Sequence, residues 1–264
     1  MLSGTFPGDD LKQLTLFGMI TRLPNNILNE IAKQNLLNGD KKSWFAQIRS
    51  LCIQYCLPHP LTLLQKPLEK AAFKSLIKLK IADFWQIKLR ERATELSSLR
   101  YFKPEFMSLL QPHPILRTVT DSYSVNKMII QLRMLSGRYR VGTLLKHFSP
   151  SHSGICELCG LEMEDLTHLL VPRCPALAER GALLLEYSRS VLQKSPVCSS
   201  IFEAVLLCNE ETRVQFVLDC SVLPLVITAA QHDKEVLSIL FTVTRTWCYS
   251  LHRARLKLLG RWSA

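Results

Sequence analysis

The chain has 264 residues, of which 47% are hydrophobic, and it carries a net charge of +11. This composition excludes wholesale disorder, and the length allows one large domain or two small ones. The apolar runs are too short for a membrane span, which is about 18 residues or more. The first ten residues lack the basic start and apolar stretch of a signal peptide, which predicts an intracellular protein, nuclear or cytoplasmic.

The positive charge is unevenly distributed along the chain. Residues 1–148 hold 22 Lys and Arg against 10 Asp and Glu, and residues 245–264 hold five basic residues and no acidic ones. Residues 149–244 are acidic, with 6 against 12. A local excess of this kind is typical of polyanion binders and predicts RNA or DNA as a partner. The alternative interpretation is a solvated basic surface.

The hydrophobic pattern predicts a mainly α-helical protein. Asp9 and Asp10 are expected to cap a first helix that begins near Leu11. A long helix is expected from Pro67 to about Ser98, because proline is well tolerated in a first helical turn. The other predicted helices cover residues 27–37, 43–55, 121–136, 165–171, 176–192, 201–208, 212–219 and 234–259.

Nine cysteines are present, and without an export signal they are expected to be reduced. Cys198, Cys208, Cys220 and Cys248 stand singly in apolar surroundings, so each is predicted to be a small buried hydrophobic residue.

Three other cysteines and a histidine form the pattern Cys156-x2-Cys159-x8-His168-x5-Cys174. A Cys-x2-Cys pair lets two thiolates reach one metal ion from a tight turn. Four such ligands complete a tetrahedral zinc shell and leave no position for water, so the pattern predicts a structural zinc ion rather than a catalytic one. The alternative is a chance cluster of three cysteines and a buried histidine.

The residues around the ligands fit this hypothesis. Gly160 can take the positive φ that wraps the chain around a metal, and Asp165 is expected to cap the helical turn that carries His168. Pro172 is expected to end that turn and bring Cys174 into place. The five-residue gap before Cys174 is the least secure part of the pattern. His152 is the fallback ligand, and His147 is a weaker one.

Two groups of residues are predicted to bind nucleic acid. Lys70, Lys74 and Lys78 recur every four residues and form one stripe of the long helix. Their like charges repel one another, and a polyanion bound along the stripe would relieve this repulsion. A solvated lysine face is the equal alternative. The second group combines phosphate-binding cations with one aromatic ring for base stacking, and consists of Arg133, Arg138, Tyr139, Arg140 and Lys146. Tyr139 is alternatively a core residue.

Signals of catalysis are weak. Gly8-Asp9-Asp10 is similar to the aspartate pair of a polymerase palm, but a two-metal site needs a further carboxylate upstream, and a capped helix start explains the pair better. No P-loop and no Gly-x-Ser-x-Gly motif is present. The chain is therefore expected not to be an enzyme as it stands, with no small-molecule substrate and no membrane partner.

Several segments together suggest a family. LRMLSGRYRVGTLLKHF, CELCG and DLTHLLVPRCPAL resemble the region that follows the palm in the reverse transcriptases of non-LTR retrotransposons, and LTLFGMITRLP and SSLRYF are similar to the linker before its zinc segment. The resemblance implies a thumb- or linker-like helical region at 1–120, a basic connecting helix at 121–150, a zinc segment at 151–180 and a helical region at 181–264.

The resemblance implies a detached C-terminal piece of such an element, without palm or endonuclease. Its zinc ligands would be Cys156, Cys159, His168 and Cys174, although the family more often spaces the last two by four residues. The resulting hypothesis is a zinc-stabilised nucleic-acid-binding module. The alternative is a structural or protein-interaction scaffold, and a weaker reading is a fragment that supports a polymerase in trans.

Overall fold

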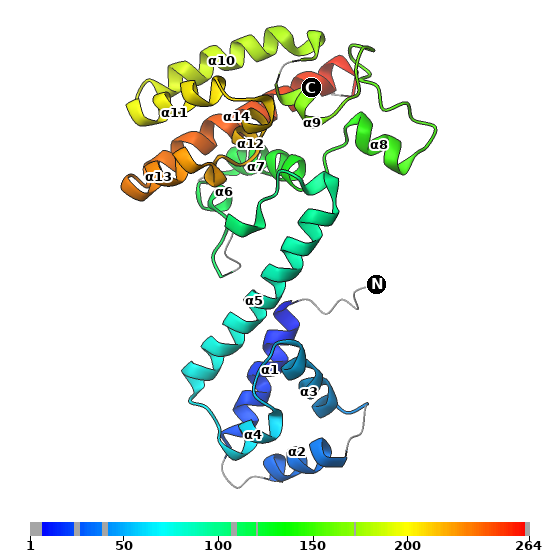
Figure 1. Cartoon of the computed structure of the whole chain (residues 1–264), viewed down its shortest axis with the longest axis vertical. Helices are drawn as coiled ribbons and strands as arrows, with labels where there is room; N and C mark the ends of the chain where they lie inside the picture. The colour runs from blue at the N-terminus through cyan, green and yellow to red at the C-terminus, as the bar shows by residue number, and fades with distance from the viewer. Residues whose placement is uncertain are drawn as a thin grey trace. The chain divides into compact units, whose positions relative to one another are not determined.

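A computed structural model describes residues 7–23, 27–38, 42–106, 110–119, 121–171 and 173–261. The regular elements in these ranges are α-helices and short 3-10 helices, and no strand is assigned there (Figure 1). A single antiparallel bridge joins Ile155 to Met163. The predicted mainly α-helical class is therefore confirmed.

The chain divides into two compact units. The N-terminal unit comprises residues 1–91 with 108–111, and the C-terminal unit comprises residues 92–107 with 112–264. Each has its own hydrophobic core. The C-terminal unit unites the connecting helix, the zinc segment and the C-terminal helices, which the sequence resemblance placed in separate regions.

Five helices build the N-terminal unit. They are α1 (Pro7–Thr21), α2 (Ile27–Asn38), α3 (Trp44–Gln54), α4 (Pro60–Gln65) and the first part of α5 (Lys70–Glu95). Phe17, Ile48 and Ile77 are fully buried between them. Helix α3 matches its predicted range, because the side chain of Ser43 accepts a hydrogen bond from the backbone N–H of Ala46 and so fixes the helix start.

The start of α1 differs from the prediction. The helix begins at Pro7, so Asp9 and Asp10 lie in its first turn instead of capping it. Asp10 is 1% exposed, and its Oδ2 accepts a 2.5 Å hydrogen bond from the Tyr55 hydroxyl. Burial and this bond raise the pKa of Tyr55. Asp10 thus joins α1 to the end of α3.

The long helix also begins later than expected, at Lys70 rather than Pro67. The carboxylate of Glu69 accepts the backbone N–H groups of Ala71 and Ala72, at 2.8 and 3.1 Å, and so caps the first turn. Lys70 and its two partners in the predicted stripe then follow on exposed positions of α5.

The C-terminal unit is built around its last helix, α14 (Glu235–Leu258), which packs against α7, α10 and α12 (Figure 1). Its other elements are η1 (Ser97–Leu99), η2 (Pro104–Phe106), α6 (Pro114–Arg117), α7 (Ser122–Leu135), α8 (Gly142–Phe148), α9 (Leu166–Leu170), η3 (Pro175–Leu177), α10 (Ala178–Leu192), α11 (Pro196–Leu206), α12 (Glu210–Asp219), η4 (Cys220–Val222) and α13 (Pro224–His232).

The cysteines of this unit test the prediction of buried thiols. Cys198, Cys220 and Cys248 are fully buried in the core, as expected. Cys208 is exposed instead, because it follows the last turn of α11, where its sulfur lies 3.4 Å from the Ala204 carbonyl.

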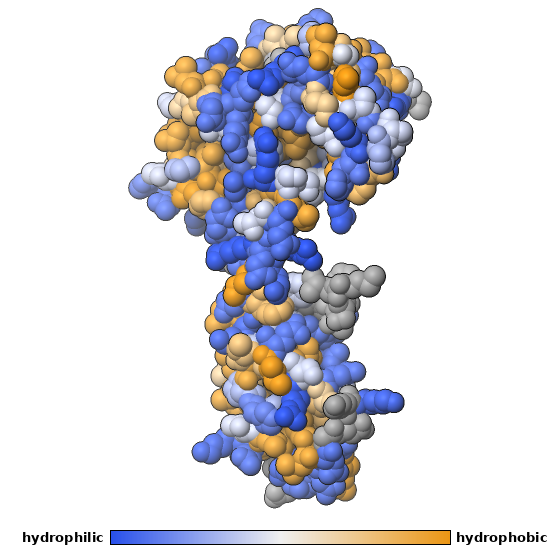
Figure 2. Space-filling view, turned by 45° about the vertical axis from the view of Figure 1, so that its right-hand side comes forward, coloured by the Kyte–Doolittle hydropathy of each residue, from blue (hydrophilic) through white to orange (hydrophobic). Residues whose placement is uncertain are grey.

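One helical run, Glu210–His232, is long and apolar enough in composition to cross a membrane. This run is divided, because η4 separates α12 from α13. Every residue from Val214 to Cys220 is buried in the core of the unit, which accounts for the apolar composition. Figure 2 shows exposed hydrophobic side chains interspersed with hydrophilic ones on the visible face.

Candidate metal centre

The first two ligands lie in a tight turn that the isolated Ile155–Met163 bridge closes. The backbone N–H of Cys156 donates to the Glu162 carbonyl, and that of Gly160 donates to the Cys156 carbonyl, both at 2.8 Å. Gly160 has φ 66°, the left-handed conformation that glycine adopts readily, as predicted. This turn holds Cys156 and Cys159 on one side of the bridge.

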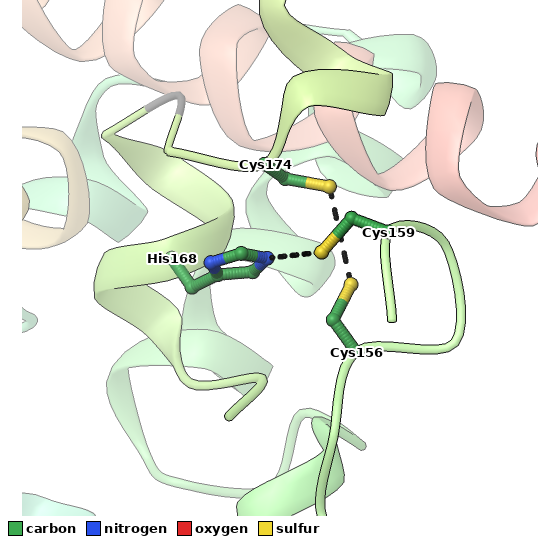
Figure 3. Close-up of side chains that lie close together, drawn as sticks. All are labelled: Cys156, Cys159, His168 and Cys174. Carbon is green, nitrogen blue, oxygen red and sulfur yellow. Dashed lines mark hydrogen bonds between the residues drawn. The ribbon is translucent and has the colours of Figure 1, made fainter. Parts of the chain in front are cut away.

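His168 belongs to α9, and its helical placement follows from the predicted cap. Asp165 Oδ1 accepts a 2.7 Å hydrogen bond from the backbone N–H of His168, which starts the helix. The imidazole Nε2 lies 3.5 Å from Cys159 Sγ, and its Nδ1 lies 3.3 Å from a carboxylate oxygen of Glu162 (Figure 3). A carboxylate on the second nitrogen is a common way to orient a metal-binding histidine.

Cys174 reaches the cluster despite its longer spacing from His168. It is fully buried directly before η3, and its sulfur lies 3.9 Å from Cys156 Sγ (Figure 3). The ligand atoms of all four residues lie within 4.8 Å of one another. Pro172, predicted to bring Cys174 round, lies outside the described residues.

These distances fit a single four-coordinate ion. Zinc–sulfur bonds of about 2.3 Å and zinc–nitrogen bonds of about 2.05 Å in a tetrahedron separate two sulfurs by about 3.8 Å and a sulfur from a nitrogen by about 3.6 Å. The Cys156–Cys174 and Cys159–His168 distances are 3.9 and 3.5 Å. The four side chains can therefore hold one metal ion.

The thiols differ in how readily they ionise. Burial raises the pKa of Cys156, and burial together with the neighbouring Cys156 raises that of Cys174 to about 12. Burial also acts to raise the pKa of Cys159, but backbone N–H groups of residues 161 and 162 outweigh it and lower that pKa to about 7. The thiolate is the form of cysteine that binds a metal. A bound cation would stabilise the thiolates against burial and against the neighbouring sulfur, which both raise their pKa values.

A buried ion pair connects the metal turn to α14. Arg255 Nε and Nη2 donate to the two carboxylate oxygens of Glu164, at 2.7 and 2.8 Å, and both side chains are at most 5% exposed. Glu164 also accepts the backbone N–H of Gly142 at 2.7 Å. The sequence analysis counted Arg255 only among the five basic residues of 245–264 and missed this pair.

A second contact supports the same connection. The indole N–H of Trp247 donates to the carbonyl of Leu170, at the end of α9, at 3.1 Å. Leu169, Leu170 and two of the ligand cysteines belong to the main core of the C-terminal unit. The metal segment is therefore part of a larger core and does not depend on the metal alone.

The two spare histidines do not join the cluster. His152 Nδ1 accepts the backbone N–H of Gly154 at 3.0 Å, and its Nε2 lies 3.7 Å from Glu157. His147 is exposed and packs against the Phe148 ring, with 5.3 Å between the ring centroids.

Seven of the eight residues predicted to contact nucleic acid are exposed cations. Lys70, Lys74 and Lys78 belong to the N-terminal unit, and the others to the C-terminal unit. None of the seven forms an ion pair with a described residue. The four in the C-terminal unit are Arg133, Arg138, Arg140 and Lys146.

Tyr139 is the exception among these eight residues. It is only 7% exposed, and its hydroxyl lies 2.9 Å from His252 Nδ1 on α14. Burial raises its pKa to about 12. The alternative of a core residue is therefore correct, and the expectation that this ring stacks on bases is wrong.

The fold and the site together define a helical protein with a buried Cys3His cluster that can bind a metal ion. No protein family, no curated protein and no solved structure matches the chain. The resemblance to retrotransposon reverse transcriptases therefore stays a prediction.

Proposed function

We propose that the chain is a zinc-stabilised module that binds RNA or DNA in the nucleus or cytoplasm. The observation that carries this proposal is a group of four exposed cations on α7, on α8 and in the segment between them, which have no ion-pair partner among the described residues. Residues 121–150 contain five Lys and Arg and a single acidic residue. Cations without acidic partners are available for phosphate oxygens.

The turn that ends α7 fixes the backbone of Arg138. Gly137 has φ 66°, and the backbone N–H of Arg138 donates to the Arg133 carbonyl at 2.8 Å, which is the Schellman arrangement at a helix end. Tyr139 then turns into the core, and its neighbours on both sides stay exposed. This anchoring presents Arg138 and Arg140 from a rigid segment, so less conformational entropy is lost when a ligand binds.

Zinc is the ion that the ligand set supports best. Three thiolates and one imidazole suit a soft or borderline ion, whereas Mg²⁺ and Ca²⁺ prefer oxygen. With four protein ligands the proposed role is structural. Three thiolates and one Zn²⁺ give the site a net charge of about −1, so we assign phosphate binding to the surrounding cations.

In this proposal the module is a non-catalytic relative of the C-terminal part of a retrotransposon reverse transcriptase. Its task would be to hold template or target nucleic acid. The proposal rests on the segments that resemble the family and on the Cys3His cluster.

The test is nucleic-acid binding at several salt concentrations. Changing Arg138 and Arg140 to Glu is expected to weaken binding to any sequence and to reduce the slope of log affinity against log salt by roughly one for each phosphate that the protein no longer neutralises. Lys70, Lys74 and Lys78 changed to Glu test the other unit in the same way. Arg189→Glu, at an exposed arginine already paired with Glu203, is the matched control. No binding at low salt would overturn the proposal.

A protein-interaction scaffold is the second candidate. It is favoured by exposed hydrophobic side chains on the metal turn, where Leu161 is 72% exposed and Met163 43% exposed. The scaffold is favoured if the affinity of the protein for nucleic acid changes neither with salt concentration nor with any of the charge reversals.

A further inference from the structure

A hollow of about 640 Å³ opens in the C-terminal unit, and its lining includes Gly137, Tyr139 and Val141, the neighbours in sequence of the exposed Arg138 and Arg140. Its lining includes Leu96, Ser97 and Ser98 around η1, and Thr143 and Phe148 of α8. The volume falls inside the range of roughly 300–1,000 Å³ that is usual for sites that bind small groups. The hollow is therefore large enough for a planar ring system.

The floor of this hollow is apolar and aromatic. Met134, Tyr139 and Leu166 line it, and Tyr101 is only 3% exposed there. The Arg100 guanidinium carbon lies 4.5 Å from the centre of the Tyr101 ring. An apolar floor with one cation at its edge suits a flat, polarisable group.

Polar side chains also line the hollow. The hydroxyl of Thr167 lies 3.3 Å from that of Tyr101 and 3.4 Å from Arg100 Nη2. Asp165 and Ser97 also line the hollow. These groups include both hydrogen-bond donors and acceptors, as the edge of a nucleobase requires.

One of the aromatic rings that line the hollow is exposed. Phe148 is 75% exposed, although burial of such a side chain is worth roughly 1.5–3 kcal/mol. It ends α8, the same helix that carries Lys146. The chain from Gly137 to Phe148 thus supplies three of the four cations and part of the lining of the hollow.

We infer that this hollow receives one unpaired base of a single-stranded nucleic acid, which stacks on Phe148 while the cations contact its phosphates. The inference rests on the proposed function and specifies its substrate. A base in a duplex is stacked and paired, so it cannot enter a hollow of this kind without first leaving the helix. The module therefore prefers single strands to duplexes.

The test measures fluorescence anisotropy with a labelled 12-nucleotide strand and with the same strand in a duplex. The whole chain, loaded with zinc, is compared with Phe148→Ala. Stacking on an aromatic side chain contributes about 1–3 kcal/mol per base, so the variant is expected to bind the single strand roughly 5- to 150-fold more weakly, with duplex binding unchanged. Because Phe148 is exposed, the variant retains the core.

Phe106→Ala is the matched control, since Phe106 is 55% exposed in the same unit and does not line the hollow. Ser97→Glu gives an independent test, because it adds a carboxylate to the lining of the hollow and is expected to weaken single-strand binding as well. Equal affinities of Phe148→Ala and Phe106→Ala, or a wild type that prefers the duplex, would overturn the inference. If the Arg138 and Arg140 reversals still weaken binding, the proposed function survives that failure.

Discussion

At the residue scale, the carboxylate of Glu164 is a buried acidic group in the metal segment. It is 1% exposed and accepts hydrogen bonds from Arg255 and from the backbone of Gly142. Its Oε1 also lies 4.0 Å from Cys156 Sγ. One side chain therefore connects the metal turn, the start of α8 and the last helix.

Removing this carboxylate is expected to destabilise the fold strongly. In Glu164→Gln the guanidinium of Arg255 stays buried without its counter-ion, which costs about 3–5 kcal/mol. Urea denaturation followed by circular dichroism measures the change in the free energy of unfolding.

Glu157→Gln is the control for that experiment. Glu157 lies in the same turn as Cys156 and Cys159, and it forms a 2.9 Å ion pair with Arg261. Both side chains are accessible to solvent, and such pairs contribute at most about 1 kcal/mol. Similar losses in the two variants would show that burial of the Glu164–Arg255 pair has no special weight.

The cluster of Cys156, Cys159, His168 and Cys174 could be predicted from the sequence, because the four residues lie close together in the chain and are typical metal-binding residues. The sequence was insufficient for Glu164 and Arg255, which are 91 positions apart. Tyr139 was misassigned to stacking for a related reason, since nothing near it in the sequence reveals His252 as its partner.

At the element scale, the side-chain-capped helices α7 and α9 start where the sequence predicted, whereas α11, capped by Ser195, begins at Pro196 instead of the predicted 201. Asp121 and Asp165 cap α7 and α9 by accepting a backbone N–H three residues ahead, a signal that the sequence carries. The short helix α8 was missed because no side chain caps its start at Val141. Helix α13 was missed because Pro224 at its first turn stands inside an apolar run.

The close approach of α7 and η1 gives a prediction at this scale. A Cβ at Gly137 would lie 2.5 Å from the backbone oxygen of Ser98, and φ there is 66°. Gly137→Ala must therefore move one of the two elements. We expect it to destabilise the C-terminal unit by more than about 2 kcal/mol, because the penalty for a positive φ and the clash with Ser98 add together.

Gly260→Ala separates these two causes. Gly260 has a similar φ of 64° at the end of α14, but no atom lies within 4 Å of its added Cβ, so only the conformational penalty of about 1–2 kcal/mol applies. Thermal unfolding of both variants measures the difference. Equal losses would contradict a tight contact between Gly137 and Ser98.

At the scale of the whole molecule, the two cores are separate, and only one contains metal ligands. The division at α5 could not be foreseen, because that continuous helix begins in one unit and ends in the other. The sequence resemblance instead implied boundaries at 120, 150 and 180. Long-range packing on α14 decides the actual grouping.

Metal removal is therefore expected to affect the units unequally. We expect about one zinc per chain in the purified protein, and Cys159→Ser or a chelator should lower this value and speed backbone hydrogen exchange in α9 and α14. Exchange in α1 to α4 should stay unchanged. Cys56→Ser, at an exposed cysteine of the N-terminal unit, is the control. Less than one zinc per wild-type chain, or an equal response in both units, would contradict this expectation.

The Glu164–Arg255 pair also has a consequence for synthesis of the chain. The last metal ligand, Cys174, is made 81 residues before Arg255. At about 5–20 residues per second, the ribosome takes roughly 4–16 s to cover that distance. During this interval the thiolates and the Glu164 carboxylate have no α14 to cover them. The nascent segment is then open to oxidants and to competing metals, so early zinc capture would protect it before the fold can.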